Sequence, residues 1–250
     1  KLDYRRQALA RDLTAAKYRE QPNMTNSSSR SSVLRPTLFI LLSSFLTGCV
    51  TSTVQEIRET TTGVTTEDTV VVLGKKDRPS SQETELDFVG CVSGNLSAGK
   101  TGITAISEQR FVDEMFPWFE PRTAPIRTSN LTKLINDPLI SNKFKEIGLK
   151  YLIWIEGNTE RTDSGGTLTC GVAPGAAGCF GFLTWENDSA YEATIWDIET
   201  GKTAGRVSSE ATGTSFMPAL VVPIPFIARV KNNACTSLAK QIGSFIQNSG

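Results

Sequence analysis

The chain has 250 residues, with 26 Lys and Arg, 26 Asp and Glu, and no His. The missing His excludes Ser-His-Asp triads, Cys-His pairs and imidazole-ligated metal sites. Of the 26 basic and 26 acidic residues, 8 and 3 lie in residues 1–48, so residues 49–250 carry 18 basic and 23 acidic residues. This balance, a net charge of about −5, argues against nucleic acid as a partner.

Residues 1–23 are charged, and we interpret them as an extension upstream of the true start at Met24. Residues 24–48 have the pattern of a secretory signal, with Arg30 and Arg35 before an apolar run that ends at Leu46. A membrane-spanning helix needs about 20 apolar residues, and this run is shorter.

The signal ends in Leu46-Thr47-Gly48-Cys49, which resembles the lipobox of bacterial lipoproteins. The resemblance implies that Cys49 is acylated and becomes the first residue of the mature protein. Val50, rather than Asp, follows the cysteine, which is similar to the pattern of Gram-negative lipoproteins sent to the outer membrane. We therefore expect a protein that is anchored by lipid in the outer membrane and faces the periplasm.

Residues 49–68 are predicted to form a disordered tether between the lipid and the domain. Eight of the 19 residues from Thr51 to Thr69 are Thr, and no periodicity holds. The alternative is an edge strand of the domain, because Thr favours strands.

Residues 69–250 are predicted to form one α/β (α+β) domain, a mixed sheet with helices packed on it. Ser80 and Glu83 fit a capping box before a helix that ends near Gly99, and Ser107 is a second candidate cap. Strands are expected at 69–74, 102–106, 151–155, 189–198 and 203–214, and helices at 86–99, 108–116, 129–136, 138–147 and 232–247. The apolar segment 216–230 contains three prolines and is not expected to be one regular element.

Four cysteines remain after Cys49, an even number that favours two disulfides in an oxidising compartment. Three pairings are open. We favour Cys170–Cys179, which flank a Gly-rich loop, and Cys91–Cys235, which lie on predicted helix faces. A metal site is disfavoured because the cysteines lack CxxC spacing and His is absent.

Gly94 to Thr101 matches the P-loop pattern through Gly94, Gly99, Lys100 and Thr101. A P-loop needs a strand before it and a helix after it, so that helix N–H groups face the phosphates. Here the expected order is the reverse. We interpret the match as coincidental, and expect no cofactor.

Two groups of side chains are candidates for a binding surface. The first is Trp118, Phe119 and Arg122 in the loop 117–125, and the second is Phe180, Phe182 and Trp185 in and after the apolar loop 170–182. Exposed apolar residues mark protein or membrane contacts, and the alternative is that they fill the core. Five carboxylates form no recognisable catalytic constellation: Glu120, Asp163, Glu186, Asp188 and Asp197.

The segments 117–125, 179–185, 191–202 and 218–230 resemble a family of uncharacterised proteobacterial lipoproteins. The order of strands and helices is also similar, in topology alone, to the curli-secretion lipoprotein and to TolB N-terminal type domains. That family has no established activity to carry over, and we expect a binding, scaffold or accessory role in the cell envelope. The partners would be the membrane, through the lipid on Cys49, and unidentified envelope proteins. The alternatives are a carboxylate-based enzyme and a nucleotide-binding protein.

Overall fold

The computed structural model describes residues 50–76, 83–98 and 103–247. Their elements are β1 (Val50–Arg58), β2 (Thr69–Gly74), α2 (Leu86–Ala98), β3 (Thr104–Ile106), α3 (Glu108–Glu114), α4 (Thr128–Ile135), α5 (Pro138–Glu146), β4 (Leu149–Ala173), β5 (Ala176–Asp197), β6 (Lys202–Ala219) and α6 (Val230–Gln247). The predicted lipobox, Cys49 and the signal lie outside the described residues.

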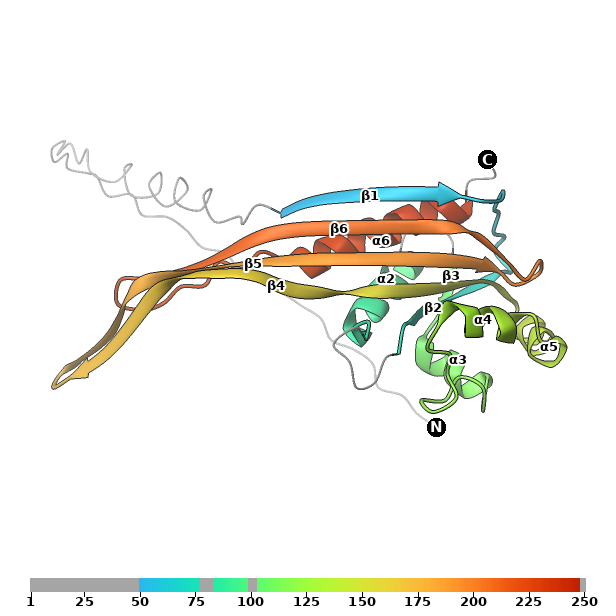
Figure 1. The fold of residues 1–250 in the computed structure, drawn as a ribbon, viewed down its shortest axis with the longest axis horizontal. Coiled ribbons are helices and arrows are strands. Elements are labelled where there is room, and N and C mark those ends of the chain that lie inside the picture. Colours follow the sequence, from blue (N-terminus) through green and yellow to red (C-terminus); the bar gives the residue numbers. More distant parts are fainter. Residues whose placement is uncertain (1–49, 77–82, 99–102, 248–250) are drawn as a thin grey trace, which may run out of the picture. The chain divides into compact units, whose positions relative to one another are not determined.

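The strands form one mixed sheet in the order β1-β6-β5-β4-β2-β3. Strand β2 runs parallel to β3 and β4, and the remaining neighbours are antiparallel. With helices on both faces, this arrangement confirms the predicted α/β fold class (Figure 1).

Strand β2 is buried on both faces, as its continuous run of β-branched residues predicts. Val70 and Val72 pack into a core that includes residues of α2 and α6. Val71 and Leu73 face the opposite way, into a second core with residues of α3, α4 and α5.

Helix starts follow local side-chain chemistry in two places, and the sequence misleads in a third. Ser107 Oγ accepts a hydrogen bond from the N–H of Arg110, which confirms its role as the cap of α3. Asp137 caps α5 in the same way. The predicted capping box is wrong because α2 begins at Leu86, three residues after Glu83, while Ser80 lies outside the described residues.

The predicted tether is wrong for residues 50–68. Val50–Arg58 is an edge strand that pairs with β6 from Val50↔Gly213 to Arg58↔Gly205. The Arg58 guanidinium donates to the Phe245 carbonyl over 3.0 Å and lies 4.1 Å from the Phe245 ring centroid. Thr62, four residues after the end of β1, is also buried. The edge of β6 supplies the hydrogen-bond partners that residues 50–58 lack as an isolated segment, so the domain begins at Val50 rather than at Thr69.

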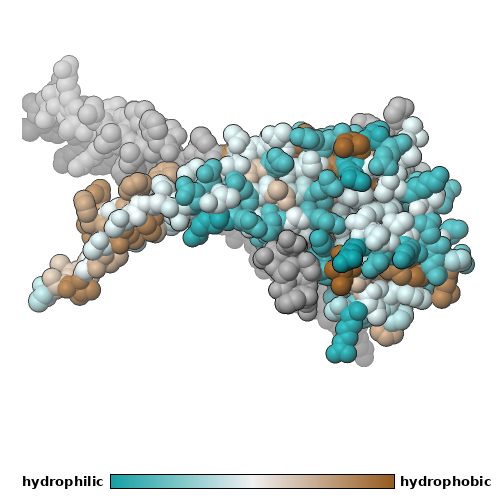
Figure 2. All heavy atoms as spheres, viewed as in Figure 1, coloured by the Kyte–Doolittle hydropathy of each residue, from teal (hydrophilic) through white to brown (hydrophobic). Residues whose placement is uncertain are grey.

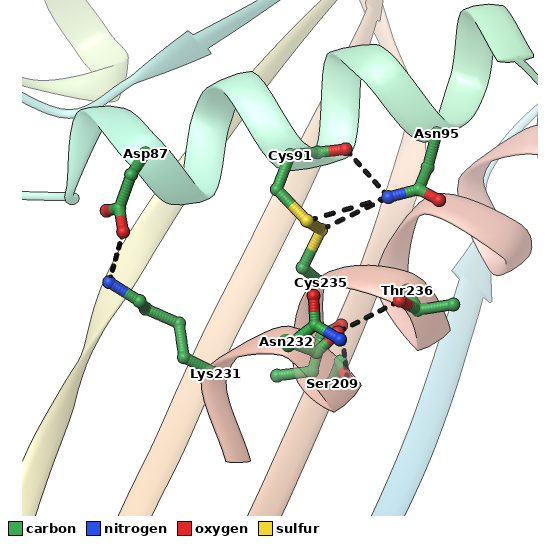
Figure 3. Close-up of a disulfide and its surroundings, with 9 residues drawn as sticks. Asp87, Cys91, Asn95, Ser209, Lys231, Asn232, Cys235 and Thr236 are labelled. Carbon is green, nitrogen blue, oxygen red and sulfur yellow. Dashed lines mark hydrogen bonds and ion pairs between the residues drawn. A yellow bond between two sulfur atoms is a disulfide. The ribbon is translucent and has the colours of Figure 1, made fainter. Parts of the chain in front are cut away.

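The predicted disulfide Cys91–Cys235 is confirmed and joins α2 to α6, with 6.3 Å between the Cα atoms (Figure 3). Asn95 Nδ2 donates to the Cys91 carbonyl over 2.9 Å and lies near both sulfur atoms. An ion pair between Asp87 and Lys231 joins the same two helices, and the Lys231 ammonium lowers the pKa of the Asp87 carboxyl.

Candidate binding surface

Three strands continue beyond the body of the sheet. Strand β2 accompanies β4 only as far as Gly74↔Ile155, and β1 accompanies β6 only as far as Val50↔Gly213. Past these points β4, β5 and β6 extend away from the helices, as Figure 1 shows. We call residues 164–185 and 214–228 the arm.

The tip of the arm is a tight hairpin, not the predicted loop 170–182. Strands β4 and β5 stay paired up to Ala173↔Ala176, and Pro174 and Gly175 make the turn. Gly175 has φ +88°, a conformation that Gly adopts without steric cost. Cys170 and Cys179 lie directly opposite each other and form the second predicted disulfide, which confirms that pairing.

Beyond the end of β6, the chain folds back on the arm. Strand β6 pairs with β5 up to Gly181↔Ala219. Val221 then accepts a hydrogen bond from Cys179 N over 2.8 Å, and Phe226 pairs with Phe216 through two backbone hydrogen bonds and a stacked ring contact at 4.7 Å. As expected, residues 216–230 are not one regular element: 216–219 are the end of β6, 220–229 are irregular, and α6 begins at Val230.

The surface of the arm is apolar and exposed. Exposed fractions reach 89% for Val172, 71% for Phe180 and 78% for Leu220, so these residues do not fill the core. Residues 164–185 and 211–228 contain no Lys, Arg, Asp or Glu. Figure 2 shows hydrophobic residues concentrated along the arm, whereas the rest of this face is mostly polar with scattered apolar atoms.

The two predicted groups of surface residues do not come together. Phe180 and Phe182 are exposed on one face of the arm, while Trp185 is partly buried on the other, 5.6 Å from the Arg161 guanidinium. Phe119 is only 5% exposed and packs edge-on against Phe111 in the second core. Phe119 is therefore mostly buried, unlike Phe180, because sequence does not tell which aromatic residues of a loop turn inward.

Helices α2 and α3 flank a groove of about 730 Å³ on the side of the domain. Arg122 and Phe119 line it together with the exposed Leu86 and Ile126. Trp118, the remaining member of the predicted group, is partly buried against the second core rather than in this lining.

Glu85, which precedes α2, joins β4 and β5 a few residues before the arm begins. Its carboxylate accepts from the Thr159 N–H on β4 over 3.1 Å and from the Tyr191 hydroxyl on β5 over 2.8 Å. The Tyr191 ring stacks on Phe88 with 3.5 Å between centroids. Burial raises the pKa of the Tyr191 hydroxyl well above its usual value of 10.0, so it stays protonated as a donor.

The candidate carboxylates do not converge in a pocket. Asp163 and Glu186 lie opposite each other on β4 and β5, and Glu186 is two residues from Asp188 toward the arm tip. Asp197 accepts two backbone N–H groups in the turn after β5. Glu120 lies in the loop after α3. Neither the groove nor a hollow of about 710 Å³ at the arm tip is lined by any of the five. Within the described ranges, no three His, Cys, Asp or Glu side chains are grouped to hold a metal ion.

The order of elements around the P-loop match disfavours a nucleotide site. Gly94 lies inside α2 and strand β3 follows, the reverse of a P-loop, while Gly99, Lys100 and Thr101 lie outside the described residues.

Two sequence signals could have revealed the arm. Pro174-Gly175 is a turn dipeptide, and Cys170 and Cys179 lie at equal distances on either side of it, as cross-strand partners in a hairpin do. The two stretches without charged residues, 164–185 and 211–228, mark the same region.

None of the helices in the described part of the chain is long and apolar enough to cross a membrane. No protein-family model matches the chain, and no curated protein matches it.

Among solved structures, the chain is similar to a PelC dodecamer from Paraburkholderia phytofirmans in space group P6, at 13% identity and a TM-score of 0.36, covering 80% of this chain and 100% of that one. A variant of the same PelC in space group C2 gives 14% identity, a TM-score of 0.34 and coverage of 80% and 98%. At these values the likeness carries no argument about function, and the dodecamer is a property of PelC.

Proposed function

We propose that this chain is a lipid-anchored protein of the cell envelope, held in the outer membrane through Cys49 and facing the periplasm. Its role is binding or scaffolding rather than catalysis. The observation that carries the proposal is the exposed, uncharged arm, which begins beside Val50, the residue after Cys49.

The position of the anchor gives the domain two ends with different surroundings. Because Val50 pairs with Gly213 at the arm end of β6, a lipid on Cys49 holds that end near the bilayer. The turn between β5 and β6 and the helices α4 and α5 lie at the other end of the sheet, away from the arm (Figure 1). The groove on the side of the domain and this distal end are then accessible to another envelope protein.

Two further features support an envelope location. Both disulfides suit an oxidising compartment, where such bonds form and persist. The Leu46-to-Cys49 motif follows a signal-like apolar run.

The test is the intact mass and membrane fractionation of the mature protein expressed in a Gram-negative host. We expect a chain that starts at Cys49, carries acyl chains and sediments with outer membranes. Cys49→Ser should either release the protein or leave it unprocessed, because one acylated residue carries the attachment. A wild-type protein that is soluble and has no acyl mass would contradict the proposal.

A further inference from the structure

The arm is too apolar to be left in water without a partner. Val172, Phe180, Leu220 and Val221 are each more than half exposed and line one hollow at its tip. Phe182 and Val222 are also more than half exposed. Contiguous apolar surfaces of this kind on a soluble domain mark contact sites for proteins or membranes.

The path of the chain indicates which partner it is. Phe216 lies three residues beyond Gly213 along β6, so the apolar surface starts roughly 10 Å from the end of β1 at about 3.4 Å per residue. Asn187 pairs with Gly213, and the turn at the arm tip lies 11 to 12 residues before Asn187 in the chain. At the same rise per residue, the tip is roughly 40 Å beyond Val50. A lipid on Cys49 therefore brings a bilayer to the base of the arm.

Charge distribution agrees with this placement. The uncharged arm is bounded by Arg161 and Asp163 on β4, by Glu186 on β5, and by Glu210 and Arg229 on either side of the 211–228 stretch. Charged groups thus lie at the base, whereas the surface toward the tip offers Phe, Val, Leu and Ile side chains together with Thr hydroxyls. Aromatic and aliphatic side chains on a polar backbone suit the boundary between headgroups and acyl chains.

The backbone argues for a position along the membrane surface. Beyond Ile155 no other strand of the described residues pairs with the outer edge of β4, and past Thr159, whose N–H donates to Glu85, the N–H and C=O groups on that side need water or headgroups. In hydrocarbon each unsatisfied group costs several kcal/mol, but at the interface these partners are present. Phe180, Phe182 and Thr184 are alternate residues of β5 and so share one face of the arm. Phe216 is opposite Thr184 on β6 and lies on that same face.

We propose that the arm is a second membrane-contact site, with Phe180, Phe182 and the Leu220–Ile224 segment inserted into the interfacial region of the leaflet that holds the lipid on Cys49. The inference rests on the proposed function for its anchor. The arm contact adds buried apolar area to that anchor and fixes the orientation of the domain on the leaflet.

The experiment uses the full acylated protein reconstituted into phosphatidylethanolamine and phosphatidylglycerol vesicles, with and without bromine on the acyl chains. Phe180→Trp places a reporter on the arm. Leu139→Trp, at an equally exposed position on α5 at the other end of the domain, is the matched control. Val222→Trp is a second arm reporter, which keeps the test valid should Phe180→Trp fold poorly.

We expect brominated lipid to quench the added emission of both arm reporters and to leave that of Leu139→Trp unchanged. If the vesicles carry the protein but neither arm reporter is quenched, the arm contact is refuted while the anchor stands. Arm reporters shielded from aqueous acrylamide but not quenched by brominated lipid would show a protein partner or a second copy there, which also overturns the proposal. If the protein lacks acyl mass and does not float with vesicles, the proposed function itself fails.

Discussion

Replacing both Cys91 and Cys235 by Ala should cost far more stability than replacing Cys170 and Cys179. The first disulfide closes a loop of 144 residues, and the loop-entropy model gives about 5 kcal/mol for that length. The second closes 9 residues, which corresponds to about 2.6 kcal/mol. The difference of about 2.4 kcal/mol comes from chain entropy alone.

The surroundings of the two bonds widen this gap. Cys235 is 1% exposed and lies in the core between α2, α6 and the sheet, so its loss also leaves a void. Cys170 is exposed at the arm tip, where opening the hairpin leaves the core intact. For a domain of about 200 residues, 1 kcal/mol corresponds to about 2–4 °C, so C91A/C235A should lower the Tm by about 10–20 °C.

The assay is thermal and urea unfolding of the oxidised protein, with C170A/C179A as the matched control and thiol labelling to confirm the remaining bond. Equal losses in the two variants, or a larger loss in C170A/C179A, would refute the reasoning. Such a result would mean that the arm, rather than the contact between α2 and α6, limits global stability.

Three further outcomes are expected. Tyr191→Phe removes a hydrogen bond to the Glu85 carboxylate and should lower the free energy of unfolding by about 1.5–3 kcal/mol in urea titrations at pH 7. Because burial raises the Tyr191 pKa above 10.0, its contribution is present below pH 10 and is lost as pH rises further, so this variant should lose less stability than wild type between pH 9 and pH 11. Gly157→Ala puts a Cβ 2.0 Å from the Ala190 carbonyl oxygen, at a φ of +132°. It should lower the free energy of unfolding by about 1–3 kcal/mol in the same titration, and an unchanged free energy would contradict this. Lys100→Ala should change stability by less than about 0.5 kcal/mol, and ATP binding that this substitution abolishes would revive the P-loop.

The parts of the fold that the sequence predicts are those fixed by local pattern and burial. Val70 to Leu73 is apolar at every position, and the structure buries it on both faces. Ser107 caps its helix with its own side chain, so no distant residue is needed to locate that start. The cysteine pairing followed from spacing around a turn and from two helix faces.

The parts that sequence reasoning missed depend on partners far away in the chain. Residues 50–58 form a strand only because the edge of β6, more than 140 residues later, is open to them. The arm lacks clear alternation of apolar and polar residues because both of its faces are solvated, which removes the periodicity that marks half-buried strands. Phe119 and Phe180 both lie in stretches whose sequence predicts a loop, yet Phe119 is in the core and Phe180 is exposed.

The construction of the arm is itself an argument for its use. Past Gly181↔Ala219 the arm is reduced to two strands, and a two-stranded hairpin is marginally stable in water. The Cys170–Cys179 bond lies two residues beyond that point on β5, where the third strand has ended and covalent linkage replaces it. An exposed segment with no core of its own, yet held in one conformation by a disulfide, a tight turn and the returning Val221, is a preorganised surface. That preorganisation lowers the entropy cost of binding, and it supports contact rather than core-building as the role of the arm.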